Sequence, residues 1–292
     1  QPAAGGRELG LAPQERVTAV DGAAEAQAML RRLCGPRAPV LLQLEGAWLE
    51  GGAQVRIEDL VVRYRGPADV IRGIGLSFRE AQKVGIAGKT GCGKSTLLLS
   101  LLRIVEPCGG RVLLNGLDTA TVGLTTLRRN VGLVPQDPVV FSGSLRQNLD
   151  PFGHFTEEQL WQALRQVQLA EHVESLPGRL DHGVACGGGN LSMGQRQLIC
   201  LARMVLRQPG LLLLDEATSA IDPHTQQMLH ASILSVFQRC TLVAVAHRLE
   251  TLLAFDHCVV MDHGLVIEQG SPEDLVKAGG VFAGMLAAGR KP

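Results

Sequence analysis

Residues 88–96, GKTGCGKST, have the types and spacing of a phosphate-binding loop. They fit G-x-x-x-x-G-K-[ST], follow a short apolar run and lead directly into a segment with helical periodicity. Glycines in such a loop let backbone N–H groups converge on phosphate oxygens, and the start of the following helix adds a favourable dipole. Lys94 can reach the β- and γ-phosphates, and the Ser95 hydroxyl can ligate Mg²⁺. The pattern predicts a nucleoside triphosphate site.

Two adjacent carboxylates, Asp215 and Glu216, follow the apolar run LLLL. If that run is a strand, Asp215 lies at its carboxyl end, where open α/β sheets place their ligands. Asp215 is then a candidate for the Mg²⁺ shell, and Glu216 a candidate for polarising an attacking water. Taken alone, the pair could equally cap the next helix.

Two further polar residues come at the ends of apolar runs. Gln136 follows NVGLVP, and His247 ends TLVAVAH. Because the carboxyl ends of parallel strands share one edge of a sheet, we expect both side chains to join Lys94 and Glu216 around one site. The other seven of the eight histidines have no comparable position, and we assign them structural roles.

Short strands and intervening helices must position these residues. The apolar runs are short enough for strands and apolar enough to be covered on both faces of a parallel sheet; they lie at 83–88, 130–135, 211–215 and 241–247. Helical periodicity follows the first run and precedes the third, where one apolar face holds Leu198, Leu201, Ala202, Val205 and Leu206. Thr156 and Gln159 predict a capping box. The pattern indicates a doubly wound α/β core, interrupted at about 137–208 by a mostly helical insert.

Composition narrows the function classes. The 28 basic and 28 acidic residues balance, so the chain lacks the global positive field of many nucleic-acid-binding proteins, and we expect no nucleic-acid partner. No apolar run approaches the ~20 residues of a membrane span. Seven cysteines without paired metal-like spacing indicate free thiols in a reducing compartment.

The first 46 residues are rich in Ala, Gly, Pro and Arg, and we expect a linker with at most one short helix near 23–33. Arg31 and Arg32 could contact a membrane surface, although a solvated face is the favoured interpretation. The start at Gln1, with neither Met nor a signal-peptide pattern, suggests a segment of a longer protein.

From about Trp48 almost to the C-terminus, the chain resembles the nucleotide-binding domain of ATP-binding-cassette (ABC) transporters. GKTGCGKST is similar to the Walker A motif, VPQD to the Q-loop, LSMGQ to the signature, LLLLDE to Walker B, SAID to the D-loop and AHR to the switch histidine. The resemblance implies a P-loop NTPase (ABC ATPase) core in residues 47–292, with a mostly parallel sheet, an antiparallel β subdomain and a helical subdomain at 137–208. Residues 1–46 would then link it to a missing transmembrane domain.

The resemblance also implies a role for each matching residue. ATP with Mg²⁺ would be held by Tyr64, Gly88, Lys89, Thr90, Gly91, Cys92, Gly93, Lys94, Ser95, Thr96, Gln136 and Asp215, with Tyr64 stacked on adenine. Ser95, Gln136 and Asp215 would be the metal ligands, and Glu216, His247 and Gln136 the catalytic residues. In such transporters two cassettes pair head to tail, so Ser192, Met193, Gly194 and Gln195 would contact ATP bound by a second cassette. Ser192 at the start of a helix, in a chain with one P-loop, agrees with a phosphate supplied by a partner, and it can also N-cap that helix.

Two stretches resemble the second cassette of the ABCC, or multidrug-resistance-associated, subfamily: FSGSLRQNLDPF (141–152) and VACGGGNLSMGQRQLICLAR (184–203). The resemblance implies an ATPase that powers a membrane transporter from the cytosolic face, through contacts with transmembrane domains. Two residues depart from the general pattern. Met193 replaces a signature glycine, and Cys92 occupies a variable position, where it is either a small filler or a thiol open to oxidation or alkylation.

Two other functions stay open at this point. The cassette could gate a channel, with hydrolysis only resetting it, because no motif excludes this. It could also be a soluble ABC ATPase acting on ribosomes or DNA, although the single cassette, the absence of a heptad run and the zero formal charge argue against it.

Overall fold

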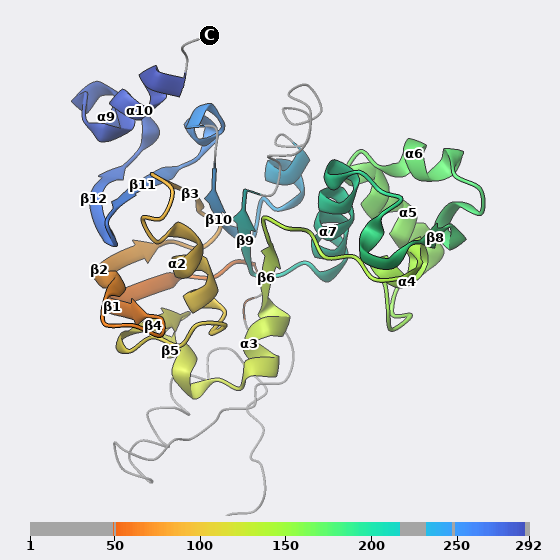
Figure 1. Ribbon diagram of the computed structural model, residues 1–292, viewed down its shortest axis with the longest axis horizontal. Helices are drawn as coiled ribbons and strands as arrows, with labels where there is room; N and C mark the ends of the chain where they lie inside the picture. Colours follow the sequence, from red (N-terminus) through yellow and green to blue (C-terminus); the bar gives the residue numbers. More distant parts are fainter. Residues whose placement is uncertain (1–48, 50, 217–231, 247–248, 290–292) are drawn as a thin grey trace, which may run out of the picture.

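The computed structural model describes residue 49 and residues 51–216, 232–246 and 249–289 (Figure 1). Three predictions therefore fall outside the described residues: the linker at 1–46, the D-loop at 219–222 and the placement of His247. None of the helices in the described ranges has the length and apolar character needed to cross a membrane.

A six-stranded sheet forms the centre of the molecule. Its order is β12 (Leu265–Gly270), β11 (His257–Asp262), β3 (Lys83–Gly88), β10 (Thr241–Val245), β9 (Leu211–Asp215) and β6 (Val131–Val134). Every neighbouring pair is parallel except β11 with β12. The mostly parallel sheet is confirmed, and all four predicted runs are strands of it, with small differences at their ends.

Both faces of this sheet are covered, as the uninterrupted apolar runs predicted. Side chains alternate across a strand, so Leu211 and Leu213 join one hydrophobic cluster while Leu212 and Leu214 join another. All four leucines are at most 5% exposed. A strand with polar residues on one side would leave one of these clusters unfilled, which explains why β9 consists of leucines up to Asp215.

The first cluster lies between the central sheet and a four-stranded antiparallel sheet. The order of this sheet is β2 (Asp69–Phe78), β1 (Val55–Arg63), β4 (Gly109–Leu114) and β5 (Leu117–Asp118). Helix α2 (Lys94–Leu101) packs into the same cluster through Leu97, Leu98 and Leu101. The predicted antiparallel β part is therefore confirmed, and it anchors the helix that follows the phosphate-loop pattern.

The second cluster includes the helical part, which lies on the side of the molecule away from the antiparallel sheet (Figure 1). Its main elements are α4 (Leu145–Leu149), α5 (Glu157–Gln166), α6 (Ala170–Ser175) and α7 (Met193–Arg207), with the short pair β7 (Gly143–Ser144) and β8 (Gly183–Val184) and the 3₁₀ turns η2 (Arg179–Asp181) and η3 (Cys186–Gly188). The capping box of Thr156 and Gln159 is confirmed at the start of α5. The α/β fold class with a helical part is thus confirmed; the domain boundaries at 47, 137 and 208 stay predictions.

Helix α7 buries a wider stripe than the sequence indicated. Leu198 and Leu201 are buried as expected, but Leu206 is only partly buried. Ile199 and Met204, which the predicted face did not include, are buried as well. The reason is that α7 contacts α4 and α5 on one side and β6 on the other, so it is covered from two directions.

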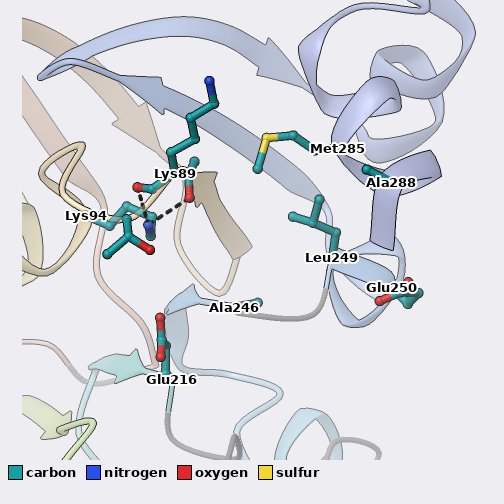
Figure 2. Close-up of a pocket in the computed structure, with 10 residues that line it drawn as sticks. Lys89, Lys94, Glu216, Ala246, Leu249, Glu250, Met285 and Ala288 are labelled. Atoms are coloured by element: carbon teal, nitrogen blue, oxygen red, sulfur yellow. Dashed lines mark hydrogen bonds between the residues drawn. The ribbon is translucent and has the colours of Figure 1, made fainter. Parts of the chain in front are cut away.

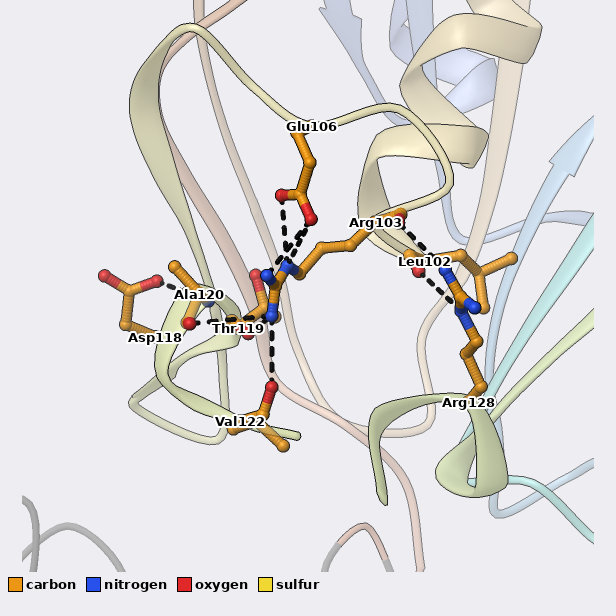
Figure 3. Close-up of polar contacts among 8 residues, drawn as sticks. All are labelled: Leu102, Arg103, Glu106, Asp118, Thr119, Ala120, Val122 and Arg128. Atoms are coloured by element: carbon orange, nitrogen blue, oxygen red, sulfur yellow. Dashed lines mark hydrogen bonds and ion pairs between the residues drawn. The ribbon is translucent and has the colours of Figure 1, made fainter. Parts of the chain in front are cut away.

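Two arginines form hydrogen bonds around the end of α2 (Figure 3). Arg103 donates to the carbonyl oxygens of Thr119 at 2.9 Å and Val122 at 3.0 Å, around the turn η1 (Thr119–Thr121), and forms an ion pair with Glu106 at 3.0 Å. Arg128, on α3 (Leu124–Asn130), donates to the carbonyl oxygen of Arg103 at 3.0 Å. These bonds link the residues that follow α2 to η1 and α3, so α2 is fixed at the end opposite the phosphate loop.

The remaining described elements follow β10. They are the 3₁₀ segment η4 (Leu249–Ala254) and the helices α9 (Pro272–Ala278) and α10 (Val281–Gly289). Glu268 on β12 accepts from the N–H of Phe282 at 2.9 Å, which ties the start of α10 to the edge of the sheet. The six cysteines in the described ranges are free thiols, as the sequence predicted.

Lys83 joins the first residue of β3 to a distant segment. Its side chain is 8% exposed, and Nζ donates to the carbonyl oxygens of Phe237 at 2.8 Å and Cys240 at 2.6 Å, among others. Burial lowers the pKa of Lys83 from its ordinary value, while Cys240 and Asp256 oppose the shift. The carbonyl oxygens follow the helical residues 232–236, so this lysine holds the chain immediately before β10.

We predict that Lys83→Met destabilises the protein, because the buried carbonyl oxygens of Phe237 and Cys240 would lose their donor. A buried acceptor left unpaired costs about 1–3 kcal/mol. Urea denaturation should show a lower free energy of unfolding for this variant. Lys277→Met, at a lysine whose side chain is 75% exposed, is the matched control and should unfold like the wild type. Equal stability of Lys83→Met and wild type would contradict the role of Lys83.

Candidate functional site

The phosphate-loop pattern lies between β3 and α2, as its sequence predicted. Gly88 has φ +147°, and a Cβ there would collide with the Met261 carbonyl group and the Cys92 Sγ, so this position requires glycine. Gly93 has φ +108° and is the N-cap of α2, which has no side-chain cap and no acidic residue in its first turn. The first N–H groups of α2 thus lack a side-chain acceptor, which suits binding of an anion.

Lys94 folds back over this loop. Its Nζ donates to the carbonyl oxygens of Gly88 at 2.8 Å and Lys89 at 2.9 Å (Figure 2). Cys92 Sγ lies 3.9 Å from the same Nζ, and the Cys92 side chain is 4% exposed. This burial favours a small filler over a thiol open to reagents.

Ser95 and Asp215 come together although 120 positions separate them in the sequence. The Ser95 hydroxyl donates to Asp215 Oδ1 at 3.2 Å. Burial raises the pKa of the Asp215 carboxyl from its ordinary value, and the Ser95 hydrogen bond and the charge of Lys94 oppose that rise. The pair places two oxygen ligands beside the phosphate loop, and oxygen ligands are the type that Mg²⁺ prefers.

Glu216 and Gln136 form a second pair. Gln136 Nε2 donates to Glu216 Oε2 at 3.1 Å. Glu216 has φ +50°, which is uncommon for a residue with a Cβ, and its N–H donates to the Val245 carbonyl oxygen at 3.1 Å. The ends of β9 and β10 therefore hold the backbone of Glu216, while Gln136 holds its carboxylate. Gln136 was also a predicted metal ligand, but its hydrogen bond in the described chain goes to Glu216.

A cavity of about 800 Å³ brings the phosphate loop and Glu216 together (Figure 2). It is lined by Gly88, Lys89, Thr90, Lys94, Glu216, Ala246, Leu249, Glu250, Met285 and Ala288. The last four belong to η4 and α10, which the sequence did not predict as part of the site. The spacing of Met285 and Ala288 on an apolar helix was the available signal, and it is too common to identify a cavity wall.

Tyr64 lies just beyond β1, close to the phosphate loop. Its hydroxyl is 3.2 Å from Thr96 Oγ1, and the residue is 48% exposed. Tyr64 is therefore not packed into a core, and its aromatic ring faces solvent near the loop. Tyr64 is not among the residues that line the cavity.

The turn at 192–195 lies on the helical part, with its start exposed at Ser192. Ser192 Oγ accepts from the Gln195 N–H at 3.1 Å, and Gln195 Oε1 accepts from the Ser192 N–H at 2.8 Å. These two bonds form the capping box of α7. The turn is separate from the cavity, since none of its residues lines it, and it is open to contact from outside the chain.

The comparisons with known proteins agree with this geometry. The family model described as "ABC transporter" matches residues 71–219. The human ATP-binding cassette sub-family C members 2 and 3 are 45% and 46% identical to the chain, over 78% and 80% of it. The chain spans 15% of the length of each of these two relatives.

A solved structure is similar as well. It is described as a bacterial Atm1-family ABC exporter with ATP bound, and the match has a TM-score of 0.80 at 31% identity. This match covers 91% of the present chain and 47% of the exporter chain. The chain therefore belongs to the ABC transporter family, as an ATPase cassette similar to those of sub-family C.

Proposed function

We propose that this cassette binds ATP with Mg²⁺ in the 800 Å³ cavity and hydrolyses it to drive a membrane transporter, paired head to tail with a second cassette. The observation that carries the proposal is that Lys94 and Glu216 line one cavity, with Asp215 and Ser95 paired beside it. Phosphoryl transfer requires a cation that binds the phosphates, oxygen ligands for a metal ion and a carboxylate that positions the attacking water.

Each side chain has a role that its contacts support. Lys94 would exchange its two carbonyl partners for phosphate oxygens, and the uncapped first turn of α2 would bind the same phosphates through its N–H groups. Ser95 and Asp215 would hold Mg²⁺, which would neutralise the charge that develops on the phosphate oxygens. Glu216 would accept the proton of the attacking water, with Gln136 fixing the carboxylate through the 3.1 Å hydrogen bond.

The remaining predicted roles belong to this proposal too. Tyr64 would stack on the adenine, and His247 would support the attack on the γ-phosphate. Ser192, Met193, Gly194 and Gln195 would contact ATP bound by the second cassette, which the exposure of Ser192 supports. Relatives named as sub-family C members, and an exporter with ATP bound, favour transmembrane domains as the further partners and the cytosolic face of a membrane as the location.

We predict that Lys94→Ala and Glu216→Gln separate binding from hydrolysis in the full-length protein. Lys94→Ala should abolish nucleotide binding, because the loop loses its cation. Glu216→Gln should still bind ATP, because the amide keeps an oxygen for Gln136 to donate to. Its turnover should fall by about 10²–10⁴, the usual cost of removing a positioned base. A fluorescent ATP analogue and a phosphate-release assay measure the two properties.

Glu80→Gln is the control for this pair, since it makes the same chemical change on an exposed turn outside the cavity. It should retain wild-type binding and turnover. If Glu216→Gln hydrolyses ATP at the wild-type rate, Glu216 is not the base, and the proposed mechanism fails at that step.

We also predict that Asp215→Asn makes the nucleotide-free protein more stable at neutral pH. A raised pKa means that the neutral carboxyl stabilises the fold fully below the ordinary value of 3.8, and that this contribution is lost as the pH rises through the folded-state pKa. Ionised Asp215 therefore costs stability at pH 7.5, and asparagine removes this cost while it can still accept from Ser95.

Thermal melts at a pH near 3.8 and at pH 7.5 should show a larger advantage of Asp215→Asn at the higher pH. Added Mg²⁺ and ATP should raise the melting temperature of the wild type more than that of the variant, because ligand binding to the folded state stabilises it. A variant that melts below the wild type at pH 7.5 without nucleotide would contradict the prediction.

A further inference from the structure

His172 contacts the turn at 192–195 from another helix. It lies on α6, and its Nε2 is 2.9 Å from Gln195 Nε2. Both residues are partly buried. The sequence predicts a structural role for every histidine except His247. The contact connects His172 to Gln195, the residue that completes the capping box of Ser192.

The orientation of the Gln195 amide follows from its other partner. A backbone N–H can only donate, so the atom of Gln195 that receives the Ser192 N–H at 2.8 Å must be the oxygen, Oε1. The nitrogen, Nε2, is then the atom that faces His172, and an amide nitrogen can only donate. The capping box therefore dictates the direction of the hydrogen bond to the imidazole.

This direction dictates the protonation state of His172. Its Nε2 must accept, which requires a lone pair on that nitrogen and places the ring proton of the neutral form on Nδ1. In the imidazolium form both ring nitrogens carry hydrogens, so Gln195 Nε2 and His172 Nε2 would be two donors facing each other. The amide would have to turn away or lose one partner, and turning it would remove the acceptor of the Ser192 N–H.

We propose that His172 is a positioning residue that, when neutral, holds Gln195 and through it the Ser192 turn in the geometry that contacts the second cassette's ATP. The proposal rests on the proposed function, since it needs Ser192 to act on a partner's nucleotide. It adds a residue from α6 to that contact and makes the contact sensitive to protonation.

The charged groups around His172 have other partners or face solvent. Its own helix carries the exposed Glu171 and Glu174. On α5 and η2, which pack against α6, and on α7, which carries Gln195, the charged residues are Glu157, Glu158, Arg165, Arg179, Asp181, Arg196, Arg203 and Arg207. Glu157 and Asp181 pair with Arg146, and Arg179 lies over the Trp161 ring. The α7 arginines donate to carbonyl oxygens: Arg196 to Gly187, Arg203 to Asn148 and Arg207 to Arg128. Within the described ranges no ion pair includes His172, so the amide of Gln195 is its specific partner.

The test compares two variants of His172 in the full-length protein. His172→Phe keeps a ring but offers Gln195 no acceptor, whereas His172→Gln offers an amide oxygen. We expect ATP turnover at pH 8 to fall roughly 2- to 10-fold in His172→Phe, which is the fold-change that one net hydrogen bond corresponds to, and to recover in His172→Gln. Binding of a fluorescent ADP should change less than 2-fold in both, because ADP has no γ-phosphate for the turn to contact.

A pH profile separates positioning from packing. Imidazole side chains change charge between about pH 5 and 8. The ratio of wild-type to His172→Gln turnover should therefore fall as the pH drops from 8 to 5.5. His154→Gln removes an exposed histidine that stacks on Phe152, and its ratio to wild type should not change with pH. Equal turnover of wild type and His172→Phe, an equal loss in both His172 variants, or a ratio independent of pH would overturn the proposal.

The variant Ser192→Ala distinguishes a failure of the His172 proposal from a failure of the proposed function. If Ser192→Ala lowers turnover and His172→Phe does not, the positioning role of His172 is wrong while the proposed function stands. If Ser192→Ala hydrolyses ATP like the wild type, the turn does not serve a second cassette, and both proposals fail.

Discussion

The parallel alignment of β3, β10, β9 and β6 is the constraint on which the site depends. Parallel strands end at one edge of the sheet, and here that edge carries the phosphate loop, Asp215 and Glu216, and the segment with Gln136. The alignment requires that apolar side chains cover both faces of the sheet. The two hydrophobic clusters meet this requirement, so the core of the protein also sets the geometry of its site.

Two pairs of residues from distant parts of the sequence meet at this edge of the sheet. Ser95 with Asp215, and Gln136 with Glu216, are each joined by a hydrogen bond across 120 and 80 sequence positions. Adjacent carboxylates in the sequence thus have different neighbours in space. Asp215 faces the start of α2, and Glu216 faces the segment after β6. This separation is what the proposed function requires, in which Asp215 would hold a metal ion and Glu216 would receive a proton.

The fold and the loop could be predicted because their signals are local. Apolar runs of strand length and the spacing of GKTGCGKST each lie within a few consecutive residues, and the polar residues at strand ends follow from the parallel sheet. The contacts of Lys83 and His172 could not be predicted. Each depends on where a segment more than 20 positions away comes to lie, and neither residue type has a pattern that reports it. His247 lies outside the described residues, so its placement stays a prediction.

The hydrogen bonds from Lys94 to the carbonyl oxygens of Gly88 and Lys89 have a consequence for ligand selection. Because the ammonium group already has two neutral acceptors within its own loop, an incoming molecule must offer better ones to displace them. Anionic oxygens do so, since Coulomb attraction between opposite charges adds to the hydrogen bond with the ammonium group. An uncharged nucleoside would gain nothing from this lysine. The loop thereby discriminates by charge before any contact to base or sugar is made.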